Sequence, residues 1–291
     1  MRTKTNVELQ LIPNRTIMQK KQIFEENTSH NYEINPYINC AHNCIYCFAK
    51  YKNGKEPQSQ NKVTPKTDLP EALEQYIAKL KVEELPESVF FSSQTDPYQP
   101  LEAEYKITRQ CLEVLSNYPI KVEILTKSDI VLRDIDLLSK INSQVFVSFS
   151  ISDDLLRERI EPKASSISQR LDLIKKLYEN NIKVGVKLKP ILPFFFTEPE
   201  TIIKMIEQYI NDKIYIQGML YGNEAIAKIE TIAKKYYPNT YSNWQNLEKR
   251  ENFYEQTLTF LKQHELVELL PVKAEFKKGD AKSMYSEYGF Y

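Results

Sequence analysis

The chain alternates between short apolar runs and amphipathic runs from about residue 67 onward, and this alternation constrains its fold more than any other feature. The runs "SVFFSS" (88–93), "IKVEILT" (120–126) and "SQVFVSFSI" (143–151) have the length and apolar content of buried strands. Between them, "EYKITRQCLEVLSN" (104–117) and "VLRDIDLLSKI" (131–141) carry apolar residues at helical spacing. Strands that alternate with helices predict a parallel α/β sheet with helical crossovers, either an open doubly wound sheet or a barrel.

The same pattern continues on both sides of this segment. "YEINPYINC" predicts a first strand, and later strands are expected over 182–191 and 213–220. Helices are expected over 69–80, 166–181 and 199–210, which makes about six strand–helix units. No G-x-G-x-x-G or G-x-x-x-x-G-K-[ST] motif follows any of these strands, so the usual nucleotide-phosphate loops are absent.

The rhythm changes after about residue 222, where the sequence predicts two or three helices rich in Tyr and Lys. We therefore expect three parts: an N-terminal extension over 1–31, a strand–helix domain over 32–221, and a C-terminal helical extension with a tail over 222–291.

Charge and apolar content indicate the compartment and the kinds of partner. The chain has 39 basic and 39 acidic side chains, whereas a protein that binds nucleic acid mainly by charge is usually more basic. The start of the chain has no apolar signal sequence, and no run approaches the ~18 apolar residues of a membrane helix. We expect a cytoplasmic protein with no membrane partner, in which cysteines bind metal or react rather than form disulfides.

Three of the four cysteines lie within "INCAHNCIYCFAK" (38–50), as Cys40, Cys44 and Cys47 in a C-x3-C-x2-C spacing. A structural zinc site needs four ligands, and His42, His30 or Cys111 would have to supply the fourth, because no second cysteine pair exists. Three thiolates on a four-iron cluster would instead leave one iron open to a small molecule. The spacing alone leaves both possibilities open, while three histidines in the whole chain argue against a multi-histidine hydrolase.

Polar clusters follow several of the predicted strands. Besides the cysteine loop they are "SQTD" (93–96), "TKS" (126–128) and "SFS" (148–150). In parallel barrels the chemistry gathers at the carboxyl ends of the strands. We therefore expect these clusters to meet at one edge.

Several blocks of sequence together resemble the spore photoproduct lyase-like group of the radical S-adenosylmethionine superfamily, also called DNA-repair photolyase-like. The blocks are "NPYINCAHNCIYCFAKY", "TDPYQPLEAEYKITRQCLEVL", "ILTKSDIVLRDIDLL" and "FVSFSISDDLLRERIEPKASSISQRLDLIKKL", and Tyr46 matches the aromatic residue common before the last cysteine. The resemblance spans roughly residues 32–220 and is strongest to the branch of the "mobile pair" proteins.

The resemblance implies a partial (β/α)6 barrel of the TIM type that holds a [4Fe-4S] cluster and S-adenosylmethionine. Cys40, Cys44 and Cys47 would bind the cluster, while the amino and carboxylate groups of the methionine moiety would occupy the open iron. Thr95 would lie near the amino group, Lys127 would bind the carboxylate and Ser148 the ribose. Asp96 is expected either to form a turn before Pro97 or to accept a hydrogen bond from the amino group.

The implied activity is reductive cleavage of S-adenosylmethionine to a 5′-deoxyadenosyl radical, which abstracts hydrogen from an unidentified substrate, with nucleic acid as one candidate. Implied partners are an electron donor such as flavodoxin or ferredoxin and a partner radical S-adenosylmethionine protein. Ser93 stands where the lyase has its cysteine hydrogen donor, which argues against true lyase activity. Two alternatives are a zinc-stabilised binding module and a non-catalytic iron–sulfur scaffold.

The remaining features have structural interpretations. Cys111 is expected to be a core residue on a helix, and His42 a loop-shaping or exposed side chain. "ERIEPK" (158–163) is interpreted as a solvated loop, although Glu161 and Arg170 match positions common in the group. Phe194–Phe196 are expected to form a substrate wall or to pack against the C-terminal helices, and we favour packing. The lysines of "KYKNGK" (50–55) and "KAEFKKGDAK" (273–282) are expected on a solvated surface.

Overall fold

A computed structural model of the 291-residue chain describes residues 19–20, 32–47, 49, 63–92, 94–190, 199–216 and 223–269. Its centre is an eight-stranded sheet in the spatial order β1-β2-β5-β6-β7-β8-β9-β10. β1 is antiparallel to β2, and every other neighbouring pair is parallel. The strands are β1 (Gln19–Lys20), β2 (Tyr32–Ile34), β5 (Ser88–Phe91), β6 (Lys121–Thr126), β7 (Ser143–Phe149), β8 (Lys183–Leu188), β9 (Ile214–Ile216) and β10 (Val267–Leu269).

The order of the parallel strands confirms the predicted fold class. β2, β5, β6, β7, β8 and β9 lie side by side in the order in which they occur along the chain, as a partial barrel of six strand–helix units requires. β10 was not expected, and it extends the sheet beyond β9. A two-stranded hairpin of β3 (Tyr37–Ile38) and β4 (Thr64–Pro65) flanks the sheet.

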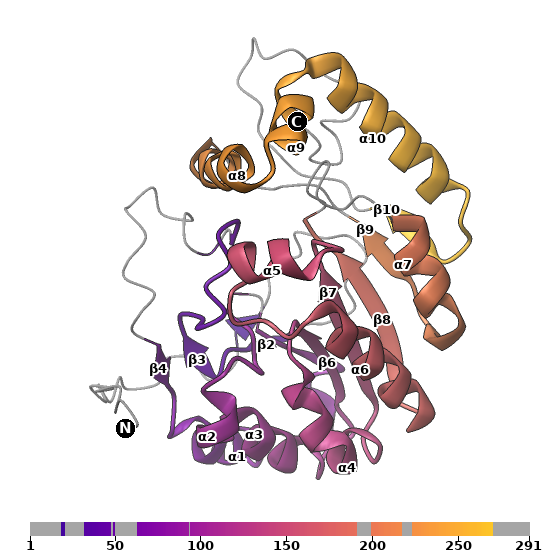
Figure 1. Ribbon diagram of the computed structural model, residues 1–291. Helices are drawn as coiled ribbons and strands as arrows, with labels where there is room; N and C mark the ends of the chain where they lie inside the picture. The colour runs from indigo at the N-terminus through magenta and orange to yellow at the C-terminus, as the bar shows by residue number, and fades with distance from the viewer. Residues whose placement is uncertain are drawn as a thin grey trace, which may run out of the picture.

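Helices cover the sheet and one end of the molecule (Figure 1). Those between the strands are α1 (Leu69–Ile77), α2 (Glu102–Tyr105), α3 (Ile107–Leu115), α4 (Ile135–Leu138), α5 (Asp154–Ile160), α6 (Ile167–Glu179) and α7 (Pro199–Ile206), with 3-10 turns η2 (Val82–Glu84), η3 (Asp129–Asp134) and η4 (Glu207–Tyr209). The C-terminal helices are α8 (Asn223–Tyr236), α9 (Pro238–Gln245) and α10 (Leu247–Lys262). Within the described ranges, none of the helices has the length and apolar character needed to cross a membrane.

The two faces of the sheet differ in chemistry because side chains alternate along each strand. Ile34, Phe91 and Ile124 are paired across neighbouring strands and belong to the main apolar core. One residue earlier in register, Glu33 pairs with Phe90 and Phe90 with Glu123, and these side chains are also buried. The second face therefore encloses polar and charged groups, as the interior of a functional barrel does.

The segment predicted as one helix over 104–117 forms two helices. Lys106 adopts a left-handed backbone conformation with φ of 53° between α2 and α3. The buried Glu102 carboxylate then accepts hydrogen bonds from the backbone N–H groups of Thr108 (3.0 Å) and Arg109 (3.2 Å). These two N–H groups open α3 and have no partner within the helix, so Glu102 supplies the missing acceptors.

Candidate functional site

The cysteine loop is fixed to the sheet by buried hydrogen bonds from the loop that follows β5. The Gln99 side chain accepts from the Ala41 N–H at 2.7 Å and donates to the Asn39 carbonyl at 3.2 Å. It therefore clasps the backbone on both sides of Cys40. Tyr37, just before the loop, donates to Glu102. The sequence motif "TDPYQP" therefore contains the residue that anchors the cysteine loop.

Two asparagines shape this loop. Asn39 and Asn43 have φ values of 66° and 57°, in the left-handed region that asparagine tolerates better than most residues. Asn39 directly precedes Cys40 and Asn43 directly precedes Cys44, so the two asparagines set the path of the chain around the first two thiols. The three cysteines of the loop are free thiols, as is Cys111, which is fully buried in the main core as expected.

All three loop cysteines line one cavity of about 240 Å³. Thr95 lines the same cavity, and its buried hydroxyl oxygen has no hydrogen-bond partner among the described residues. A buried polar atom without a partner is costly, and such atoms in native proteins usually face a ligand or water. The other lining residues are Asn35, Tyr37, Ile38, Asn39, Asn43, Ala49, Lys66 and Gln94.

Asp96 joins the loop after β5 to both the cysteine loop and β6. One carboxylate oxygen accepts from the Tyr98 N–H and the Thr126 hydroxyl, both at 2.8 Å. The other accepts from the Lys127 N–H at 2.8 Å and lies 3.3 Å from Nδ1 of His42. A carboxylate has about four acceptor sites, and protein donors use all of them here. This geometry favours an organising role for Asp96 over direct contact with a ligand.

His42 is a buried member of the same group, only 2% exposed. Burial alone would lower the pKa of its imidazole, but the Asp96 carboxylate and the Cys40 sulfur raise this pKa to about 10. The same His42 contact, with the hydrogen bonds to Lys127 and Thr126, holds the pKa of Asp96 below its usual value despite burial. His42 therefore shapes the loop from within the protein.

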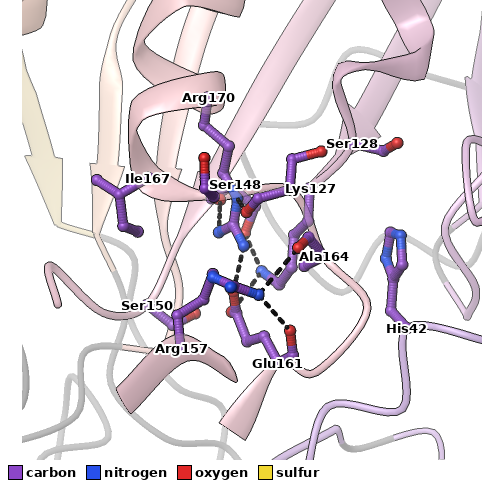
Figure 2. Close-up of polar contacts among 12 residues, drawn as sticks. His42, Lys127, Ser128, Ser148, Ser150, Arg157, Glu161, Ala164, Ile167 and Arg170 are labelled. Atoms are coloured by element: carbon purple, nitrogen blue, oxygen red, sulfur yellow. Dashed lines mark hydrogen bonds and ion pairs between the residues drawn. The ribbon is translucent and has the colours of Figure 1, made fainter. Parts of the chain in front are cut away.

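A second buried network contains Lys127, Ser148, Glu161 and Arg170, whose side chains turn toward one another (Figure 2). The Lys127 ammonium donates to the Ser148 hydroxyl at 2.5 Å and lies 3.6 Å from the Glu161 carboxylate. Arg170 forms an ion pair with Glu161 at 2.5 Å and donates to the Ser148 carbonyl at 2.9 Å. Tyr46 of the cysteine loop donates to Glu161 and lies 2.9 Å from the Ser150 hydroxyl.

This network corrects one sequence interpretation. The segment 158–163 was expected to be a solvated loop, but Glu161 is completely buried. Burial alone would raise the pKa of Glu161, yet the charges of Arg170 and Lys127 and the Tyr46 hydrogen bond lower this pKa to about 2. Arg157 holds the backbone of this turn by donating to the carbonyls of Glu161 (3.3 Å) and Ala164 (3.1 Å).

The charges of the network do not cancel. Two cations, Lys127 and Arg170, share a single carboxylate, Glu161, among the described side chains in ion-pair contact with them. Arg170 and Glu161 are fully buried, and the Lys127 side chain is 12% exposed. An excess positive charge in a poorly solvated place is unfavourable unless a nearby anion neutralises it. The Lys127 end of the network is therefore suited to an anionic group such as a carboxylate.

Two arginines, Arg109 and Arg133, form ion pairs with carboxylates of neighbouring segments. Arg133 of "LRDID" forms an ion pair with Glu102 at 2.7 Å and with Asp134 at 2.8 Å. Arg109 binds Asp134 at 3.0 Å and Asp136 at 2.8 Å. Glu102 and Asp134 have fully buried side chains, so these pairs tie α2, α3 and η3 together beneath the cysteine loop. They contribute rigidity to the site rather than a ligand.

Residues of the C-terminal helices share an apolar cluster with the cysteine loop. A small apolar cluster joins Cys44 and Tyr46 to Leu156 and Ile160 of α5 and to Ile229 and Ala233 of α8. Tyr237 and Tyr241, from the start of α9, pack against the same cluster. The extension thus covers one side of the loop and excludes water there.

Of the residues expected at the site, Thr95 lines the cavity with the three cysteines, and Lys127 and Ser148 are in mutual contact. Asn35, Gln99 and the buried state of Glu161 were missed, because each depends on contacts between distant segments. Ser93, Phe194–Phe196 and the lysine-rich segments 50–55 and 273–282 lie outside the described residues.

Comparison with known proteins agrees with this arrangement. The profile of the radical SAM superfamily matches residues 34–209, which include the three loop cysteines, Thr95, Asp96, Lys127 and Ser148. The chain belongs to the radical SAM superfamily, whose enzymes use a [4Fe-4S] cluster and S-adenosylmethionine.

Individual relatives extend the comparison. An uncharacterized protein of Methanocaldococcus jannaschii is 30% identical over 241 residues, covering 81% of this chain and 87% of the relative. The radical SAM Nalpha-GlyT isomerase of Pseudomonas phage M6 is 25% identical over 154 residues, 51% of this chain and 32% of the phage protein. A variant spore photoproduct lyase with bound AdoMet and dinucleoside spore photoproduct has the same fold. Its TM-score is 0.52 at 17% identity, over 77% of this chain and 64% of the lyase.

The residues present fit both cofactors of the superfamily. Three free thiols around one cavity suit a cluster with one open iron, and the unpartnered Thr95 hydroxyl in the same cavity suits a polar ligand beside it. The excess positive charge around Lys127 suits a carboxylate.

Proposed function

We propose that this protein binds a [4Fe-4S] cluster through Cys40, Cys44 and Cys47 and cleaves S-adenosylmethionine reductively. The single observation that supports this most is that three free thiols and an unpartnered hydroxyl line the same cavity. When bound, the cluster supplies the electron that cleaves S-adenosylmethionine to a 5′-deoxyadenosyl radical, which abstracts hydrogen from the substrate.

The chain's own residues bind and orient the cofactors. Lys127 is the proposed partner of the methionine carboxylate, Thr95 of its amino group and Ser148 of the ribose. Asp96 holds the Lys127 backbone with a hydrogen bond, and Glu161 holds its ammonium with an ion pair, so the lysine is positioned before any ligand arrives. The apolar contacts of α8 with the cysteine loop exclude water from the reaction.

We propose nucleic acid as the substrate class, because the solved structure of the lyase that shares this fold contains a bound dinucleoside spore photoproduct. An external one-electron donor such as flavodoxin or ferredoxin is the partner that the cleavage requires. Deuterium transfer from a labelled oligonucleotide into 5′-deoxyadenosine tests the substrate class. The absence of transfer from every oligonucleotide tested, with cleavage intact, would redirect the search to other substrates.

The cleavage itself is tested by anaerobic reconstitution with iron and sulfide, followed by dithionite and S-adenosylmethionine. We expect 5′-deoxyadenosine from the wild type and from Cys111→Ala, whose cysteine lies in the main core. Cys47→Ala should lose iron and give no product. A wild type with four irons and no 5′-deoxyadenosine would refute the proposal.

A further inference from the structure

Asn35 follows β2 directly and presents an acceptor with no protein partner. Its Nδ2 donates to the Glu33 carboxylate at 2.6 Å. A carboxylate accepts and does not donate, so the amide must direct its NH₂ toward Glu33 and its carbonyl oxygen away. That oxygen, Oδ1, is buried and has no hydrogen-bond partner among the described residues.

The position of Asn35 connects this acceptor to the candidate site. The Ser92 N–H donates to the Ile34 carbonyl at 2.9 Å, so the chain segments that leave β2 and β5 start side by side. Asn35 lies on the first segment and Thr95 on the second. Both line the cavity that the three loop cysteines also line, and both contribute a buried oxygen without a partner.

Asn35 Oδ1 can only accept a hydrogen bond, and the Thr95 hydroxyl can accept as well as donate, so a ligand group that donates suits both oxygens. A primary amino group presents several N–H donors, whereas a carboxylate would face the Asn35 oxygen with another acceptor. Lys66 also lines the cavity, but Asp68 and Glu33 interact with its ammonium and offset its charge. The group that fits between Asn35 and Thr95 is therefore an amine.

We propose that Asn35 Oδ1 accepts a hydrogen bond from the α-amino group of S-adenosylmethionine and so shares this group with Thr95. The inference rests on the proposed function and adds a residue from the first strand of the barrel to the cofactor site. Glu33 acts as the positioning residue that fixes the orientation of the Asn35 amide.

The test measures the dissociation constant of S-adenosylmethionine by equilibrium dialysis with the reconstituted, unreduced protein, so no turnover occurs. Asn35→Leu removes the acceptor at similar size, and Asn35→Asp keeps an acceptor oxygen. The matched control is Asn117→Leu, whose exposed amide contacts only carbonyls of its own helix, those of Glu113 and Val114. Iron and sulfide are assayed in every variant.

We expect Asn35→Leu to keep its iron and to bind S-adenosylmethionine about tenfold more weakly, the size of one lost hydrogen bond to a buried acceptor. Asn35→Asp should recover part of that loss despite the facing Glu33 carboxylate, and Asn117→Leu should match the wild type. Because Asn35→Leu and Asn35→Asp both lose the Nδ2 hydrogen bond to Glu33, a loss that Asn35→Asp restores comes from the acceptor oxygen.

Wild-type affinity in Asn35→Leu or loss of iron from Asn35→Leu would each overturn the inference. Equal weakening by Asn35→Leu and Asn35→Asp in a Glu33→Gln protein, where no second carboxylate faces position 35, would overturn it as well. Failure of the proposed function has a different signature: the wild type itself, with a full cluster, would not bind S-adenosylmethionine.

Discussion

Nδ1 of His42 lies 3.3 Å from the Asp96 carboxylate, and the carboxylate oxygen that it approaches also accepts the Lys127 N–H at 2.8 Å. One buried side chain therefore connects the loop that carries the cysteines to the strand end that carries the proposed carboxylate-binding lysine. Any displacement of Asp96 would move the two halves of the cofactor site relative to each other.

Asp96→Asn should weaken the site without changing its shape. The amide has a single acceptor oxygen, so two of the four donors around Asp96 lose their partner, at a cost of about 1–3 kcal/mol in unfolding free energy. We expect about tenfold weaker S-adenosylmethionine binding as well, by equilibrium dialysis. Asp172→Asn on the surface of α6, where Asp172 pairs only with Lys176 among described groups, is the control. Unchanged binding in Asp96→Asn would contradict the organising role.

Gln99→Leu should loosen the clasp on Cys40. Leucine has a similar volume but leaves the Ala41 N–H and the Asn39 carbonyl without their present partner. We expect iron to pass to a chelator several-fold faster than from the wild type, followed by absorbance. Gln110→Leu is the matched control, because Gln110 is exposed and bonds only to carbonyls of Tyr105 and Lys106. Equal release rates in the two variants would show that the clasp is unimportant.

Glu161 predicts a pH dependence of stability. Its pKa is lowered from 4.5 to about 2 in the folded protein, so its contribution is complete above pH 4.5 and is lost as the pH falls toward 2. Glu161→Gln should remove this contribution and leave Lys127 and Arg170 without a counter-charge, at a cost of about 3–5 kcal/mol at neutral pH. Urea unfolding at several pH values measures both effects. A Glu161→Gln protein whose stability falls between pH 4.5 and 2 as steeply as that of the wild type would contradict the assignment.

Ile229→Ala should expose the cysteine loop from the side of α8. Ile229 is fully buried against the cluster that contains Cys44 and Tyr46. We expect a loss of about 2–5 kcal/mol in stability and faster bleaching of the reconstituted protein in air. Ile77→Ala in α1 is the control, since Ile77 is equally buried in the main core. If both variants bleach at the same rate, α8 does not shield the loop.

The alternation of strands and helices could be predicted from sequence because buried parallel strands are continuous apolar runs and crossover helices carry a 3.6-residue period. β5 at 88–91, β6 at 121–126 and β7 at 143–149 lie within the predicted segments. The break at Lys106 could not be predicted, because it depends on Glu102 folding back to supply acceptors for α3. The strand β10 was also missed, since three residues carry too short a pattern.

The residues of the candidate site could likewise be predicted in part from the sequence. Spacing and resemblance pointed to Cys40, Cys44, Cys47, Thr95, Asp96, Lys127 and Ser148. Spacing and resemblance could not predict the surroundings of the site residues. Examples are the four donors around Asp96, the burial of Glu161 and the Asn35 oxygen without a partner. Each of these arises from contacts between segments far apart in the chain.

The sequence by itself determined the class of fold and pointed to the superfamily, because periodicity and motif spacing are local properties of the chain. Only the tertiary structure decided which polar groups lie buried together and which of them lack a partner. The physical reason is that the energy of a buried charge or hydrogen-bonding group depends on the neighbours that folding brings to it, and those neighbours are not adjacent in sequence.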